Sequence, residues 1–118
     1  MTTYKTAELS GYLLDLAIAK VEGHEWRMDD SFFPDCPPHV SIRDDNLGPQ
    51  WELFQPSTCW SEGGHIIDLL RIGLIPQEDS TWLAKVAASD WIVGGTTALE
   101  AAMRAYVVAK LGEEVELP

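Results

Sequence analysis

The chain has 118 residues, 46% hydrophobic and 23% charged, which is typical of one globular domain, here residues 1–118, that buries a core without disulfides or a structural metal. Its 19 acidic residues outnumber the 8 basic ones, and the net charge is −11. This charge argues against direct binding to nucleic-acid phosphates and against adsorption to anionic membranes, since both use clusters of Lys and Arg. Basic proteins, metal ions and neutral small molecules are left as partners.

The sequence predicts an intracellular, cytoplasmic protein. The first residues, MTTYK, are not a charged segment followed by an apolar run, so no secretory signal is expected. No apolar run approaches the length of a membrane span. The two cysteines, Cys36 and Cys59, are therefore expected to be reduced thiols.

The first predicted element is a helix over residues 6–22, because apolar residues recur at intervals of three and four along it. Gly23 stands where a helix commonly ends in a left-handed residue. Glu8, Asp15 and Glu22 recur every seven residues on the side opposite the apolar one. They predict an acidic stripe facing solvent.

The next segment, residues 23–59, is predicted to be rich in loops because five prolines interrupt it. Within it, alternating apolar residues favour a short strand over 39–43, and 51–54 is a second candidate. Gly63 and Gly64 are then expected to open a short helix that Gly73 ends.

A short extended segment and a third strand candidate precede the last helix. Residues 74–76 form a brief extended piece, and residues 81–87 are rich in β-branched and aromatic side chains.

The last helix has the clearest signals. Thr97 and Glu100 have the spacing of a capping box, with Thr97 as the N-cap. Glu100 and Arg104 form an i,i+4 pair in the favourable order. Lys110 lies in the last turn and Gly112 follows it, as expected for a helix C-terminus.

Together these elements predict an α+β fold, in which a small, largely antiparallel sheet packs with the N-terminal and C-terminal helices as an α/β sandwich. The last helix has alanines at 98, 101, 102, 105 and 109, so another helix can approach it closely. Either a second copy of the chain, in a two-fold homodimer, or the first helix of the same chain would cover that face.

Three segments carry a family resemblance: TAELSGYLLDLAIAKVEG, PSTCWSEGGHII and GGTTALEAAMRAYVVAKLGEEVELP. In order and spacing they resemble the NinX-like family of small phage and prophage proteins, and the layout is similar to the α-β-α sandwich domain of other small phage proteins. The resemblance implies phage or prophage origin, hence a bacterial host cell, and an α/β sandwich, but no reaction. The chain departs from the family at Cys59, where an acidic or amide residue is expected, and at His65, where proline is.

A metal site is one hypothesis. Two thiols and two imidazoles make a complete tetrahedral zinc set, and the candidates are Cys36, His39, Cys59 and His65. The alternative is that these are ordinary cysteines and surface histidines, because the spacing does not follow a zinc-binding motif. No cofactor is expected.

A binding site is expected at the glycine-rich turns that lead into helices. Helix starts present unpaired backbone N–H groups, which attract an anion or a partner's carboxylate. A tryptophan stands three residues before each glycine pair and would supply an apolar wall. The predicted binding residues are Trp60, Gly63, Gly64, Trp91, Gly94, Gly95 and Thr96. The alternative is that the glycines only permit the turns and that Thr97 caps its own helix.

No catalytic residues are predicted. His24, Glu25, Asp29 and Asp30 put a base and carboxylates in one segment. An acidic, solvated loop is the favoured explanation for them, and the common hydrolase, phosphate-binding and metalloprotease motifs are absent.

The function predicted from sequence is a non-enzymatic phage or prophage accessory protein that binds a protein partner. The alternatives are a small enzyme or ligand-binding domain that uses the glycine-rich helix starts, and an acidic inhibitor that mimics DNA. An exposed apolar patch would favour the first. A pocket with converging polar groups would favour the enzyme or ligand-binding domain.

Overall fold

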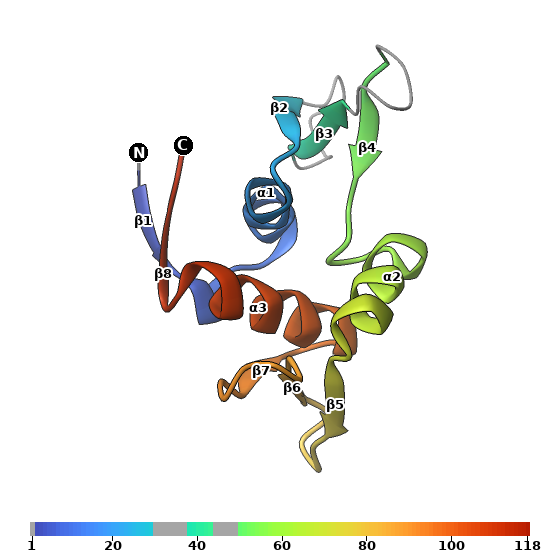
Figure 1. Ribbon diagram of the computed structural model, residues 1–118, viewed down its shortest axis with the longest axis vertical. Helices are drawn as coiled ribbons and strands as arrows, with labels where there is room; N and C mark the ends of the chain where they lie inside the picture. Colours follow the sequence, from blue (N-terminus) through green and yellow to red (C-terminus); the bar gives the residue numbers. More distant parts are fainter. Residues whose placement is uncertain (1, 30–37, 44–49) are drawn as a thin grey trace.

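A computed structural model describes residues 2–29, 38–43 and 50–118 (Figure 1). Its helices are the short 3-10 helix η1 (Thr6–Glu8), α1 (Gly11–Glu22), α2 (Trp60–Leu70) and α3 (Ala98–Leu111). Its strands are β1 (Thr2–Lys5), β2 (Glu25–Asp29), β3 (His39–Arg43), β4 (Glu52–Phe54), β5 (Gly73–Pro76), β6 (Trp82–Lys85), β7 (Val93–Gly95) and β8 (Glu114–Leu117). The described strands pair antiparallel in three sheets, ordered β1–β8, β2–β3–β4 and β5–β6–β7. The predicted α+β class is confirmed, with the strands divided among three sheets rather than gathered in one.

Helix α3 crosses the middle of the molecule (Figure 1). The β5–β6–β7 sheet packs on one side of it, and α1 packs on another. The β2–β3–β4 sheet lies beyond α1, and α2 lies beside the first half of α3. Strands β1 and β8 run side by side and bring the two termini together.

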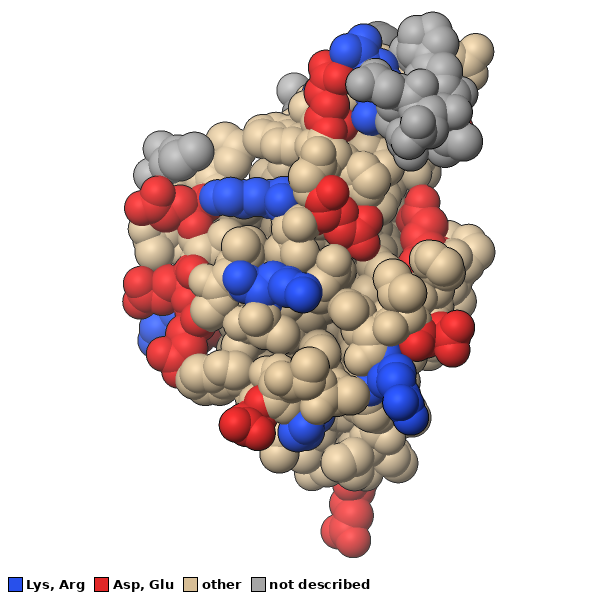
Figure 2. Space-filling model, in the orientation of Figure 1, with Lys and Arg blue, Asp and Glu red and all other residues tan. Residues whose placement is uncertain are grey.

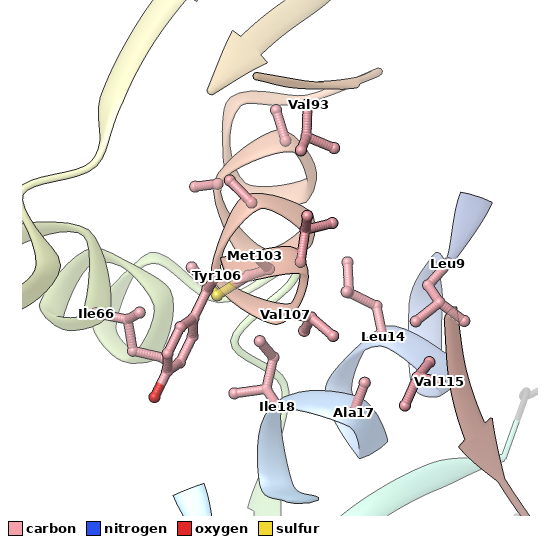
Figure 3. Close-up of a cluster of buried hydrophobic side chains, with 14 of the residues drawn as sticks. Leu9, Leu14, Ala17, Ile18, Ile66, Val93, Met103, Tyr106, Val107 and Val115 are labelled. Atoms are coloured by element: carbon pink, nitrogen blue, oxygen red, sulfur yellow. The ribbon is translucent and has the colours of Figure 1, made fainter. Parts of the chain in front are cut away.

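The hydrophobic core lies mainly between α1 and α3 (Figure 3). Leu14 and Ile18 of α1 meet Met103 and Val107 of α3, and all four are fully buried. Ile66 extends the same cluster toward α2. Each such side chain contributes roughly 1.5–3 kcal/mol by leaving water, so the contact between α1 and α3 stabilises the fold substantially.

Helix α3 begins and ends as predicted. The Thr97 hydroxyl accepts a hydrogen bond from the Glu100 amide at 3.0 Å, and Arg104 lies 3.2 Å from the Glu100 carboxylate. That carboxylate accepts from the amide and hydroxyl of Thr96, both at 3.0 Å, and not from the Thr97 amide of a regular capping box. Gly112 ends the helix with a φ of 91°. One chain already buries the alanines at 98, 101, 102 and 105.

The helix predicted over residues 6–22 is interrupted. After η1, Leu9 and Ser10 are extended, and α1 starts at Gly11, whose φ of 58° suits glycine. The Thr6 hydroxyl donates to the Gly112 carbonyl at 2.8 Å, which fixes η1 against the end of α3. Gly23 ends α1 in the left-handed conformation, with a φ of 73°, as expected.

The prediction that Asp15 faces solvent is wrong. Asp15 is only 4% exposed. The sequence pattern assumed that one face of α1 is open, but β3 covers it and Ser57 hydrogen-bonds to Asp15. Asp15 is therefore sealed in while Glu8 and Glu22 remain at the surface.

The prediction that Gly63 and Gly64 open a helix is also wrong. Helix α2 begins at Trp60, after Cys59, and both glycines lie in its second turn. A Cβ atom on Gly63 would lie 2.5 Å from Leu99 Cδ2 and would collide with the Pro56 carbonyl oxygen. Gly63 is therefore needed for close packing of α2 on α3 and not for a turn.

Helix α2 ends before Gly73. Its last residue is Leu70, and Arg71 takes the left-handed conformation with a φ of 54°. The Ile72 amide then donates to the Ile67 carbonyl at 3.0 Å, which satisfies one of the last carbonyls of the helix. Gly73 opens β5 instead of ending the helix.

The strand predicted over 39–43 is confirmed as β3, and the other candidates become β4, β5 and β6 with shifted ends. Strands β1, β2, β7 and β8 were not predicted. Gly94 and Gly95, expected as a turn, belong to β7.

Candidate functional site

One pocket has a volume of about 390 Å³ and is called the Trp91 pocket. It lies where β1 and η1, the segment entering β7, and the turn between α3 and β8 come together. Its lining residues are Lys5, Ala7, Trp91, Ile92, Val93, Gly94, Val108, Glu113 and Glu114.

Arg104 of α3 holds two walls of the Trp91 pocket at a fixed separation. Its Nε donates to the Leu9 carbonyl at 2.6 Å and its Nη1 donates to the Gly94 carbonyl at 3.0 Å. Because Glu100 also binds this guanidinium, the side chain is held in place from a third direction. The η1 wall and the β7 wall are thus both tied to α3.

Backbone hydrogen bonds hold the wall formed by β1. The Thr6 amide donates to the Glu113 carbonyl at 2.8 Å, and the Thr6 hydroxyl donates to the Gly112 carbonyl at 2.8 Å. At the opposite wall, the Trp91 amide donates to the Ser89 hydroxyl at 3.2 Å. The pocket is therefore built on fixed backbone rather than on long side chains.

The Trp91 pocket combines apolar walls with a charged rim. Trp91 is 47% exposed and Ile92 is 59% exposed, so both present apolar surface to solvent. Lys5 is the cross-strand partner of Glu114, so its positive charge offsets the negative charge of that glutamate. The charge of Glu113 then leaves the rim with a net negative charge. An apolar side chain that carries or adjoins a positive charge would fit this combination.

Trp60 lies in a different pocket, of about 200 Å³, between the starts of α2 and α3. Ser57, Thr58, Thr97, Ala98 and Leu99 also line it. The structure thus places Trp60 in the same pocket as Thr97. The sequence instead suggested two separate groups, Trp60 with the glycines at 63 and 64, and Trp91 with Thr96. Trp91 and Gly94 do share a pocket, as grouped from the sequence.

Two backbone amides at the start of α3, those of Thr96 and Glu100, are already hydrogen-bonded within the chain and are not free to bind a ligand. The Thr96 amide binds Glu100, and the Glu100 amide binds Thr97. Gly95 is buried, and a Cβ atom there would lie 2.8 Å from the Ala101 Cα. Gly95 therefore permits close packing on α3.

A third pocket, of about 180 Å³, is lined in part by the buried residue Asp15 and is called the Asp15 pocket. Sequence reasoning missed it, because only the tertiary covering of α1 turns this acid inward. Burial raises the pKa of Asp15 from 3.8 to about 6; hydrogen bonds from Ser57 oppose this shift and the charge of Glu62 adds to it. A buried acid with a raised pKa in a pocket marks a candidate functional site.

Among the described residues, no three His, Cys, Asp or Glu side chains gather as a metal-binding group. Cys36 lies outside the described residues. Cys59 precedes α2, and its sulfur lies 3.0 Å from the Ser61 hydroxyl, whose hydrogen bond lowers the pKa of the thiol. His65 is exposed on α2, and His39 opens β3.

The residues weighed for catalysis form structural contacts where they are described. His24 lies 2.9 Å from the Glu22 carboxylate and packs edge-on against Phe54, with ring centroids 5.4 Å apart. Arg43 binds both carboxylate oxygens of Glu25 across the β2–β3 pair. Asp30 and the side chain of Asp29 lie outside the described part of the chain.

Acidic and basic side chains are interspersed on the face shown in Figure 2. A continuous acidic track, which phosphate mimicry needs, is not seen on that face. None of the helices in the described ranges is long and apolar enough to cross a membrane.

Comparison with known proteins agrees with the family suggested by the sequence motifs. No curated protein has a sequence that matches the chain. A family model described as bacteriophage P22 NinX matches residues 5–110, a range that runs from the end of β1 to the last turn of α3. Because this match covers most of the chain, the protein belongs to the phage P22 NinX family.

Proposed function

We propose that this phage protein is a non-enzymatic accessory factor that binds a protein partner, and that the Trp91 pocket is where the partner docks. The observation that carries the proposal is that two exposed apolar residues, Trp91 and Ile92, line a pocket whose η1 and β7 walls are hydrogen-bonded to α3. Binding energy at protein interfaces concentrates in a few buried aromatic or aliphatic anchors that fit preformed pockets.

The size and charge of the pocket favour a partner segment of particular chemistry. A volume of about 390 Å³ is enough for a large apolar side chain to insert between Trp91 and Val108. The rim carries Glu113 and Glu114 against Lys5, and the whole chain carries a net charge of −11. An apolar anchor flanked by Lys or Arg would be attracted to this surface and correctly oriented on it.

Trp60 is more exposed than Trp91, at 58%, but supports docking less well. Its pocket is about half as large. None of the described residues that line it is acidic, so charge attraction from them would not add to apolar contact there. The Trp60 surface therefore serves as a control site and the Trp91 surface as the test site.

Site-specific photo-crosslinking in infected host cells tests the proposal. A benzophenone-bearing residue would replace Ile92 in one variant and Leu69 in another; Leu69 is on α2, is 71% exposed and is not among the residues that line the Trp91 pocket. We expect a discrete crosslinked protein at position 92 that is absent at position 69. The proposal fails if position 92 gives no discrete product, or if both positions give the same one.

A second candidate function is binding of a small ligand, and the Asp15 pocket favours it. Polar groups converge there from α1, β3 and the segment before α2, which is the arrangement expected of a ligand or enzyme site. The glycine-rich helix starts proposed for this alternative are less favourable, because Gly63 and Gly64 are inside α2.

Mimicry of DNA has the least support of the three functions. It was based on the net charge alone, and burial of Asp15 removes one acid from the predicted stripe on α1. Phosphates on one DNA strand recur every few ångströms without interruption by positive charge, whereas the face in Figure 2 mixes both signs.

A further inference from the structure

The Asp15 pocket is separate from the Trp91 pocket and draws its walls from three parts of the chain. Helix α1 provides one wall, the start of β3 provides a second, and the segment between β4 and α2 provides the third. The lining residues are Gly11, Tyr12, Asp15, Pro38, His39, Gln55 and Thr58.

Among the described residues, Ser57 supplies the hydrogen bonds recorded to the Asp15 carboxylate. The Ser57 amide donates to its Oδ1 at 2.8 Å, and the Ser57 side chain also hydrogen-bonds to it. An ionised carboxylate has about four acceptor positions. Among the residues the structure describes, no Lys, Arg or His forms an ion pair with Asp15, although the residue is only 4% exposed.

A carboxylate buried this deeply is costly unless a positive charge or further hydrogen-bond donors reach it. Asp15 lines the pocket together with Gln55 and Thr58, two residues whose side chains carry oxygen atoms. We infer that the Asp15 pocket binds a small organic cation, with an ammonium or guanidinium nitrogen placed against the Asp15 carboxylate.

The volume and the lining restrict the ligand class. About 180 Å³ corresponds to roughly six waters at bulk density and is below the usual range for drug-sized ligands. A short aliphatic amine or a single guanidinium group fits this volume. A transition-metal ion is disfavoured, because the described residues place no group of three ligating side chains anywhere.

The neighbouring charges set how binding depends on pH. Glu62 acts on Asp15 from α2 and adds to the attraction for a cation. His39 and Tyr12 are the other titratable residues on the described pocket wall. Since the pKa of Asp15 is about 6, the ionised fraction, and with it the affinity for a cation, should fall about tenfold between pH 7.5 and pH 5.

Carbon-13 NMR of the side-chain carboxyl groups tests the inference. The probe is propylammonium chloride, and the controls are 1-propanol, which has similar size without charge, and NaCl at equal ionic strength. We expect propylammonium to shift the Asp15 carboxyl signal saturably and to lower its pKa, while neither control does so. The signal of Asp79, an exposed carboxylate on the β5–β6 turn, should respond equally to propylammonium and NaCl.

The variant Asp15→Asn keeps an acceptor for Ser57 but removes the charge, so saturable binding should be lost. Glu62→Gln, which alters a nearby charge outside the pocket lining, should retain binding with a modest loss. The inference is overturned if the Asp15 pKa is the same in propylammonium and in NaCl, a comparison that needs only the unaltered protein. It is also overturned if a folded Asp15→Asn protein binds propylammonium as well as the unaltered chain does.

Discussion

The paired variants Gly63→Ala and Gly64→Ala should have opposite effects on stability, although the two glycines are adjacent in α2. Alanine is favoured over glycine inside a helix by about 0.8–1 kcal/mol, and both variants gain this term. At Gly64 the new Cβ atom would lie 3.7 Å from Trp60 Cε3, an ordinary contact. Gly64→Ala should therefore raise the free energy of unfolding by about 1 kcal/mol.

At Gly63 the new Cβ atom would collide with the Pro56 carbonyl oxygen and would lie 2.5 Å from Leu99 Cδ2. Overpacking of this kind costs about 1–3 kcal/mol, and the upper end applies because a backbone carbonyl cannot rotate away as a side chain can. The helix-propensity gain offsets part of this cost, which leaves Gly63→Ala destabilised by about 1–2 kcal/mol.

Thermal and urea unfolding of the two variants and the unaltered chain would measure the difference. A gap of about 2–3 kcal/mol between the variants corresponds to roughly 10 °C in Tm for a domain of this size. If Gly63→Ala is as stable as Gly64→Ala, then α2 does not pack on Pro56 and Leu99 as described, and the reasoning is refuted.

Three further predictions concern stability and association. Gly95→Ala should destabilise the fold by about 1–3 kcal/mol in urea unfolding, because its Cβ would lie 2.8 Å from the Ala101 Cα; an unchanged midpoint would contradict this. The raised pKa of Asp15, about 6 against 3.8, means that its stabilising contribution is full below about pH 4 and is lost as the pH rises through 6. The free energy of unfolding of Asp15→Asn, relative to that of the unaltered chain, should therefore rise by up to about 3 kcal/mol between pH 4 and pH 7. A difference between the two proteins that does not depend on pH would contradict the burial of Asp15. Light scattering at micromolar concentration should give the mass of one chain, since α3 already buries its alanines at 98, 101, 102 and 105 within that chain; twice that mass would show that copies pair through another surface.

Local signals in the sequence located the parts of the fold whose conformation is decided by neighbouring residues. Thr97 and Glu100 marked the start of α3 because capping depends on residues three apart, and Gly23 marked the end of α1 because a left-handed residue favours glycine. The strand β3 was found from its alternating pattern.

The parts that could not be predicted depend on contacts between distant residues. Gly63 looked like a helix start, because the sequence does not reveal that Pro56 and Leu99 press against it. Asp15 looked like one member of an exposed stripe, because nothing local shows that β3 and Ser57 cover it. The same is true of β1 and β8, whose pairing joins the two ends of the chain.

The candidate sites were predictable only in part for the same reason. Trp91 and Gly94 are close in sequence and do line one pocket. The pocket also includes Lys5 and Glu113, which are more than a hundred residues apart, and no pattern in the sequence connects them. The Asp15 pocket likewise combines α1 with Gln55 and Thr58.

The central claim, that a partner docks at the Trp91 pocket, is tested most directly by the affinity of the crosslinked partner for three purified proteins: the unaltered chain, Trp91→Ala and Trp60→Ala. If Trp91 lies beneath the partner's apolar anchor, its truncation should remove at least about 2 kcal/mol, which is roughly a thirtyfold rise in Kd. Trp60→Ala, which removes an equally large and more exposed side chain outside that pocket, should change Kd by less than about threefold. Equal losses in the two variants, or an unchanged Kd for a folded Trp91→Ala protein, would contradict the claim.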